Sequence, residues 1–268
     1  MSEQGGCIFC SSQGSGDFAG SARLSIAEQI RQGKADISSK RPVHSYIAYF
    51  TAFTNTYAPV ETLRALYMEA IADPEVKILS IATRPDCLGA DVLALLDEIN
   101  HIKPVWVELG LQTIHPETSA YIRRGYELSV FEQAVKELRA IDITVIVHTI
   151  LYLPGETKDD MLDTIHYLNH MDIQGIKLQL LHVLTHTDLA ADYEKHPFYI
   201  PDMQDYIQFL GTCIAHLNPE IVIHRLTGDG PKDLLIAPLW TSNKRTVLNQ
   251  LHSHLKEQDI WQGKEYYV

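Results

Sequence analysis

Apolar, β-branched runs alternate with amphipathic segments along most of the chain. The runs lie at 46–50, 78–82, 105–109, 144–153, 176–183 and 221–226. Between them apolar residues recur at helical spacing, as in Leu63, Leu66, Tyr67 and Ala70. Continuous apolar strands separated by amphipathic helices are typical of a parallel sheet covered by helices. The pattern predicts an α/β fold, which either a Rossmann sheet or a TIM-type barrel would satisfy.

The residues in the turns that follow the strands distinguish between these two folds. No G-x-G-x-x-G opens a helix after a strand, so a dinucleotide-binding Rossmann fold is disfavoured. We therefore predict a partial (β/α)6 barrel of the TIM-like type with an additional strand near 221–226. Two helix starts carry a capping-box pattern, Ser129 with Glu132 and Thr157 with Asp160. In such barrels the chemistry lies at the carboxyl ends of the strands.

Composition and charge narrow the class of protein. The 268 residues are 46% hydrophobic, which is enough for one globular domain. The chain contains no run of eighteen apolar residues, so no membrane span is predicted, and its opening MSEQGGCIFC lacks the pattern of a secretory signal. The net charge of −12 is opposite to that of a typical nucleic-acid-binding protein, although an acidic chain can carry a local basic patch. We expect a cytoplasmic protein with no membrane partner.

Two of the four cysteines form a C-x-x-C motif, Cys7-Ile-Phe-Cys10. In a reducing compartment a close cysteine pair suggests metal or redox chemistry. The pair fits half of a zinc site, a dithiol, or two ligands of an iron–sulfur cluster. Structural zinc usually takes a second close pair, whereas Cys87 and Cys213 are isolated. A thioredoxin-like motif would follow a strand, and none is predicted before Cys7.

The ends of the predicted strands are unusually polar. Burying a polar group costs free energy unless the group is paired, so buried strands are normally plain Val, Ile and Leu. His148 alone would fit a core histidine equally well. A polar residue at every strand end is better explained by a ligand site. We expect one cavity to collect Thr83, Arg84, Glu108, Gln112, His148 and Lys177.

Five segments together resemble the YhcC/YtqA-like family of radical S-adenosylmethionine (SAM) enzymes, which is related to the radical SAM domain of the elongator subunit Elp3. They are GGCIFCSSQGSGDFAG, ATRPDCL, VELGLQTIHPETSAYIRRGYE, LPGET and GIKLQLLHVL. The resemblance covers nearly the whole chain in order. It implies one radical SAM domain, with a cluster loop at 1–20, a barrel core at 21–185 and a C-terminal extension at 186–268. It also implies a [4Fe–4S] cluster and SAM as cofactors.

By this resemblance Cys7 and Cys10 match the last two of three thiolate ligands. Three thiolates leave the fourth iron open for the amino and carboxylate groups of SAM. One electron then splits the sulfonium bond, and the resulting 5′-deoxyadenosyl radical abstracts a hydrogen atom from the substrate. In the family the first ligand lies upstream, in the stretch that holds the first barrel strand. We therefore expect this chain to lack both and to hold a labile cluster, as a mis-assigned start, a fragment or a degenerate member.

The resemblance assigns roles to further residues. Phe9 would flank the cluster near the adenine, and residues 49–57, the polar end of the 46–50 strand, would face the methionine amino group. Glu108 and Gln112 would hold the ribose side, and Arg123 or Arg124 would lie near the SAM carboxylate. The backbone from Ile150 to Leu153 would meet the adenine. The substrate side would be lined by Arg84, His148 and Lys177, which are the catalytic candidates, and by Thr83, which also counts as cofactor-binding.

The kinship with Elp3 implies a substrate class. A tRNA wobble uridine, converted from its carboxymethylaminomethyl to its aminomethyl form, offers a C–H bond beside an amine. The electron donor would be a protein such as flavodoxin or ferredoxin. A small-molecule or peptide substrate stays open. So do two other classes of function, a non-catalytic module that binds SAM or RNA and a zinc-binding barrel.

Overall fold

The chain divides into two compact units, each assembled from segments that are distant in the sequence. A computed structural model describes residues 6–11, 14, 16, 19–40, 42–228 and 230–267. The first unit comprises Met1–Ser12, Leu111–Leu128 and Val147–Val268, and the second comprises Gln13–Gly110 and Ser129–Ile146. Strands β3 (Val105–Gln112) and β4 (Thr144–Leu151) have residues in both units.

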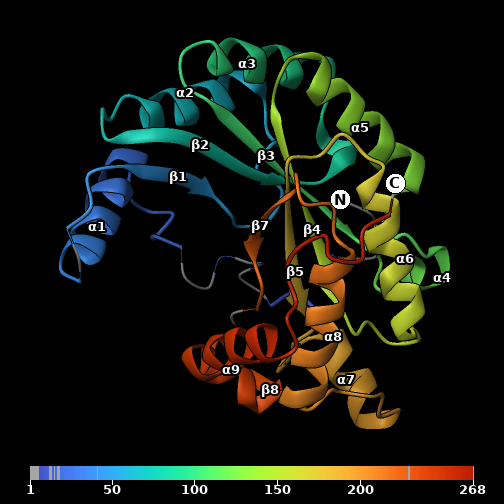
Figure 1. Ribbon diagram of the computed structural model, residues 1–268. Coiled ribbons are helices and arrows are strands. Elements are labelled where there is room, and N and C mark those ends of the chain that lie inside the picture. Colours follow the sequence, from blue (N-terminus) through green and yellow to red (C-terminus); the bar gives the residue numbers. More distant parts are fainter. Residues whose placement is uncertain are drawn as a thin grey trace. The chain divides into compact units, whose positions relative to one another are not determined.

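Six strands form one sheet in the order β1-β2-β3-β4-β5-β7 (Figure 1). The other four strands are β1 (Tyr46–Phe50), β2 (Val76–Thr83), β5 (Gly175–Leu180) and β7 (Val222–Arg225). β1 pairs in parallel with β2, β2 with β3, and β5 with β7. The strands pair in chain order without the reversal of a Rossmann sheet. The predicted α/β fold of the partial-barrel type is confirmed, and the strand expected near 221–226 is β7.

The helices of the second unit bury the apolar faces that the spacing of apolar residues in the sequence predicts. α2 (Val60–Ile71) buries Leu63, Tyr67, Ala70 and Ile71. It packs against β2, against α1 (Ile26–Ser38) and against α3 (Ala90–Asn100) (Figure 1). A short 3₁₀ turn at Pro85–Cys87 follows β2.

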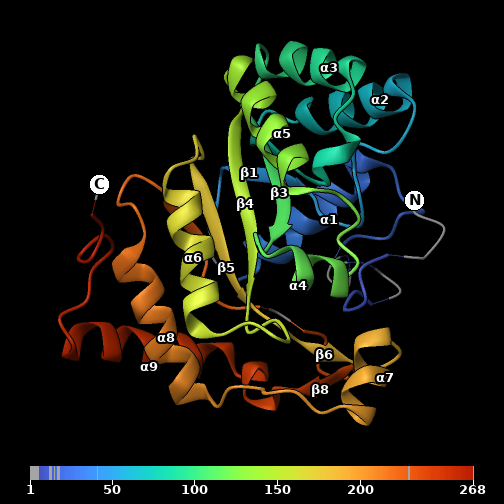
Figure 2. The ribbon, with the colours of Figure 1, turned by 90° about the vertical axis from the view of Figure 1, so that its right-hand side faces the viewer.

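The first unit holds most of the remaining helices. α4 (Pro116–Tyr121) follows β3, and α6 (Lys158–Asn169) follows β4. α8 (Met203–His216) packs against α6 and against α9 (Lys244–Glu257), which follows the 3₁₀ turn Leu239–Ser242. α7 (Asp188–Lys195) lies beside a small antiparallel pair, β6 (Val183–Leu184) with β8 (Leu235–Ala237) (Figure 2).

Two local predictions are wrong. The run at 176–183 is not one strand, because β5 ends at Leu180 and the chain turns at His182, whose Nδ1 lies 3.0 Å from the Leu180 carbonyl oxygen. Ser129 is not a helix cap, because α5 (Leu128–Ala140) begins one residue before it. The second capping box is confirmed, since Thr157 accepts from the amide of Asp160 and the Asp160 side chain accepts from the amide of Thr157. Within the described ranges, no helix combines the length and the apolar character that a membrane crossing needs.

Candidate functional site

The C-x-x-C loop is anchored by the residue that follows its first cysteine. Ile8 is 6% exposed and belongs to a core of the first unit that also holds Ile122, Leu153, Leu181, Val183 and Leu189. Its amide donates to the carbonyl of Ile122 over 3.3 Å, and its carbonyl accepts from the amide of Leu189 over 2.9 Å. The amide of Cys10 donates to the carbonyl of Cys7 over 3.3 Å, which closes the turn. Apolar packing thus positions both thiols.

Phe9 and Ile150 pack against this same core. Both were predicted as cofactor-binding residues, one beside the cluster and one at the end of β4. Tyr121 joins them, and its hydroxyl donates to Asp192 of α7 over 2.5 Å. The structure therefore brings the cysteine loop and the carboxyl end of β4 to one apolar core.

Neither Cys7 nor Cys10 forms a disulfide bond, and Cys7 is half-buried whereas Cys10 is exposed. Thiolates are the ligands that iron–sulfur clusters take from proteins. Burial raises the pKa of the Cys213 thiol inside α8, which makes that thiol unreactive. Over the described part of the chain, no three His, Cys, Asp or Glu side chains are grouped as metal ligands. The loop therefore fits two ligands of an iron–sulfur cluster.

The ends of β3 and β4 hold strained backbone. Gln112 has φ = +69° and Tyr152 has φ = +63°, which is the left-handed region that few residues other than glycine adopt. Such strain persists only where surrounding contacts impose it, and it is concentrated at ligand sites. The predicted ribose residue Gln112 is one of the two strained positions.

The adjacent arginines have different environments. Arg124 is 3% exposed, and its guanidinium donates to the carbonyls of Leu111 (3.3 Å), Thr113 (2.6 Å) and Tyr126 (3.1 Å). It therefore binds the backbone on both sides of Gln112. Arg123 is partly exposed and pairs with Asp188 at 2.5 Å.

The catalytic candidates of the first unit lie on neighbouring strands. Lys177 of β5 is 7% exposed, and its carbonyl accepts from the Thr149 hydroxyl over 3.1 Å. His148 of β4 is half-buried. The two strands are adjacent in the sheet order.

In the second unit Glu108 is 4% exposed and both of its carboxylate oxygens accept hydrogen bonds. Tyr49 donates to Oε2 over 2.9 Å and Ser80 donates to Oε1 over 2.8 Å. Tyr49 begins the polar strand end that was expected to face the methionine amino group, whereas Ser80, a polar residue within an apolar strand, was not predicted as a site residue.

Two further predicted residues of this unit have local partners. The hydroxyl of Thr83 lies 2.5 Å from that of Thr56. Arg84 binds both oxygens of Asp86, with its Nε at 2.9 Å from Oδ1 and its Nη2 at 2.7 Å from Oδ2. The six strand-end residues belong to two units, and their convergence on one cavity stays a prediction.

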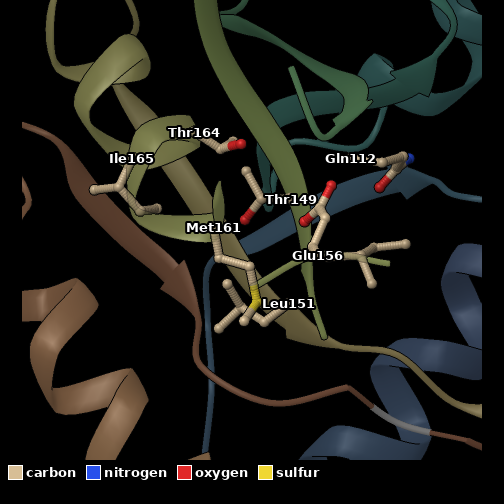
Figure 3. Close-up of a pocket in the computed structure, with 8 residues that line it drawn as sticks. Gln112, Thr149, Leu151, Glu156, Met161, Thr164 and Ile165 are labelled. Carbon is tan, nitrogen blue, oxygen red and sulfur yellow. The ribbon is translucent and has the colours of Figure 1, made fainter. Parts of the chain in front are cut away.

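A recess of the first unit contains the carboxylate of Glu156, for which no role was predicted from the sequence. Glu156 follows the turn at Gly155, whose φ is +92°, and lines the recess together with Gln112 (Figure 3). The signal in the sequence was a carboxylate directly after Pro-Gly at a strand end.

Comparison with known proteins connects these features to a family. The family model described as Radical SAM superfamily matches residues 4–168, and the model of its C-terminal domain matches residues 173–257. The uncharacterized protein YtqA of Bacillus subtilis is 42% identical over 97% of this chain and 81% of its own length. YhcC of Escherichia coli is 35% identical over 96% of this chain and 82% of its own length.

Solved structures share the fold. Archaeal Elp3 from Methanocaldococcus infernus superposes with a TM-score of 0.74 at 15% identity, over 88% of this chain and 59% of that protein. The coproporphyrinogen III oxidase HemN of Escherichia coli, described as a radical SAM enzyme, gives a TM-score of 0.55 at 16% identity, over 78% of this chain and 50% of that protein.

Proposed function

The chain belongs to the radical SAM superfamily, and on that premise we propose that it is an enzyme that binds a [4Fe–4S] cluster and SAM. When bound, these cofactors supply a 5′-deoxyadenosyl radical, which abstracts a hydrogen atom from a substrate. The observation that carries the proposal is the core shared by the cysteine loop and the end of β4, which joins Ile8, Phe9 and Ile150.

The residues of the first unit would bind and orient the cofactors. The thiolates of Cys7 and Cys10 would hold iron, Phe9 would lie near the adenine, and the backbone of Ile150 would meet the adenine. Gln112 would bind the ribose, and Arg123 would face the SAM carboxylate. The guanidinium of Arg124 already binds three backbone carbonyls, so we assign Arg124 to holding the turn around Gln112.

The resemblance assigns the remaining contacts to further residues. Glu108, held by Tyr49 and Ser80, would serve the ribose side, and Thr83 would line both the cofactor and the substrate. The catalytic candidates are Arg84 of the second unit and His148 and Lys177 of the first unit.

Anaerobic reconstitution with iron and sulfide tests the cofactor proposal. We expect the wild type to take up iron into a labile cluster, and the 5′-deoxyadenosine released with SAM and a reductant such as flavodoxin or ferredoxin measures how much of that cluster is catalytically competent. C7S and C10S should each take up far less iron, because thiolate ligands are lost. C87S is the matched control, since Cys87 lies outside the C-x-x-C motif. Equal iron in C7S, C10S and the wild type would contradict the proposal.

We further propose a modified wobble uridine of tRNA as the substrate, on the resemblance to the Elp3 group. The net charge of −12 is unfavourable for RNA binding, so a local contact would have to supply the affinity. Incubating the reconstituted enzyme with tRNA that contains carboxymethylaminomethyl-uridine should yield aminomethyl-uridine, detected by mass spectrometry of the nucleosides. Unchanged wobble nucleosides in an enzyme that still cleaves SAM would contradict this assignment.

A further inference from the structure

Two buried oxygens with no hydrogen-bond partner line the same recess of the first unit. They are Oε1 of Gln112, at the end of β3, and Oε1 of Glu156, before α6. Figure 3 draws the Glu156 carboxyl between Thr149 and Gln112, with the oxygen of the Gln112 amide turned towards Glu156 and the nitrogen turned away. A buried acceptor without a hydrogen bond lowers the stability of the folded state, so two together call for an explanation.

The other groups around the recess do not supply a donor. The Thr149 hydroxyl donates to the carbonyl of Lys177 over 3.1 Å, and the Thr164 hydroxyl lies 3.5 Å from the carbonyl oxygen of Asp160. The remaining side chains are apolar, namely Ile150, Leu151, Met161 and Ile165. The space between them is too narrow for a water molecule. A proton on the carboxyl itself is therefore the simplest donor that satisfies both oxygens.

We propose that Glu156 is a neutral carboxylic acid whose Oε1–H donates to Oε1 of Gln112, and that this bond positions the Gln112 amide for its ligand. When its oxygen accepts this bond from Glu156, the Gln112 amide points its NH₂ group away from Glu156. Gln112 then acts as a donor to a ligand hydroxyl, which matches a ribose oxygen. The positioning role rests on the proposed binding of SAM by Gln112, whereas the protonation of Glu156 does not.

The surroundings of the carboxyl favour its neutral form. Burial raises the pKa of Glu156 above its ordinary value, and the negative charge of Asp160 on α6 acts in the same direction. Hydrogen bonds from Thr113 and Thr118 and the field of His115 oppose this only in part. Oε1 has no hydrogen-bond partner, which leaves Oε2 as the oxygen that these two threonines can bind. Oε1 therefore remains for the side chain of Gln112.

A rotated amide is the competing arrangement. If the Gln112 amide were turned over, its NH₂ group would donate to an ionised Glu156, and no proton would be needed. The two arrangements differ in the charge of Glu156 and in which end of the amide meets the ligand. They therefore predict different infrared spectra and opposite responses to pH.

Difference infrared spectroscopy between the wild type and E156Q decides the protonation state. At neutral pH the exposed carboxyls are ionised, so a carboxylic-acid C=O band that is present only in the wild type belongs to Glu156. We expect that band, and E117Q, which removes an exposed carboxyl of α4, should leave it unchanged. A carboxylate band in its place would overturn the proposal.

Titration with SAM tests the positioning role. The affinity of the wild type should fall about tenfold as the pH rises through the pKa of Glu156, because one hydrogen bond is lost. E156Q keeps an N–H donor at every pH and should abolish that dependence. An affinity that rises with pH, or stays constant while the acid band disappears, would overturn the positioning role. If SAM fails to bind at any pH, the proposed function fails, and the infrared band still decides the protonation of Glu156.

Discussion

The amide of Leu189 donates to the carbonyl of Ile8 over 2.9 Å, which ties one of the two residues between the cysteines to the first turn of α7. The Ile8 side chain is 6% exposed within an apolar core. The arrangement of the two thiols therefore depends on the burial of one aliphatic side chain.

Replacing Ile8 with Ala should loosen this loop. Such a truncation removes buried methylene groups and typically costs about 2–5 kcal/mol. We expect lower stability in urea unfolding and less iron per folded chain after reconstitution. I173A is the matched control, because Ile173 is also 6% exposed in the same unit but does not belong to that core. If both variants lost iron equally, the anchoring role of Ile8 would be wrong.

Removing either donor to the buried Glu108 should destabilise the second unit. Y49F and S80A each take away one hydrogen bond to a charged group, and we expect a cost of about 1.5–3 kcal/mol for each. Because both donors bind one carboxylate, the double variant should deviate from additivity. Y46F is the control, since Tyr46 donates to a neutral carbonyl, that of Val43. A smaller cost for Y49F than for Y46F in urea unfolding would contradict this account.

Replacement by lysine should cost more stability at Arg124 than at Arg123. R124K loses the planar group that serves three carbonyls, and a lysine cannot replace it. We expect a loss of at least about 2 kcal/mol, because buried acceptors are left unmet. R123K retains a positive charge opposite Asp188 at an exposed pair, where the cost should stay below about 1 kcal/mol. Equal free energies of unfolding for the two variants would refute the distinction.

The free energy of unfolding should depend on pH through the protonation of Glu156. Its pKa is raised in the folded state, so the folded protein binds the proton more tightly than the unfolded chain. This contribution is fully present below the ordinary pKa of a glutamate and is lost as the pH rises through the raised value. The free energy of unfolding of the wild type relative to E156Q should therefore decline over that window and then level off. A difference that grows with pH would mean that Glu156 is ionised when folded.

Gly228 lies too close to His182 to accept a side chain. A Cβ at this position would lie 2.3 Å from Cε1 and 2.7 Å from Nδ1 of the imidazole. We expect G228A to destabilise the protein, and H182A to relieve part of that cost in the double variant, with a coupling of about 0.5–3 kcal/mol. G230A should be milder, because its Cβ would lie 3.1 Å from His182. Purely additive costs of G228A and H182A would show that this contact is not the cause.

Local patterns determined the element types. The apolar runs and the helical spacing of residues such as Leu63 and Tyr67 predicted strands and helices in the right order, because these periodicities depend on near neighbours. The Thr157–Asp160 capping box was predictable for the same reason. The C-x-x-C motif likewise indicated metal chemistry, which agrees with membership of the radical SAM superfamily, whereas the ligand site at the polar strand ends stays a prediction.

Contacts between distant segments decided the rest. The sequence does not reveal that Ile8 is buried against Leu189, that Arg124 rather than Arg123 is enclosed, or that the run at 176–183 breaks at His182. The sequence also does not reveal that Glu156 and Gln112 line the same recess, since each side chain alone is an ordinary polar residue. Whether a polar group is paired, charged or strained depends on the groups that surround it in space, and only the tertiary structure specifies these.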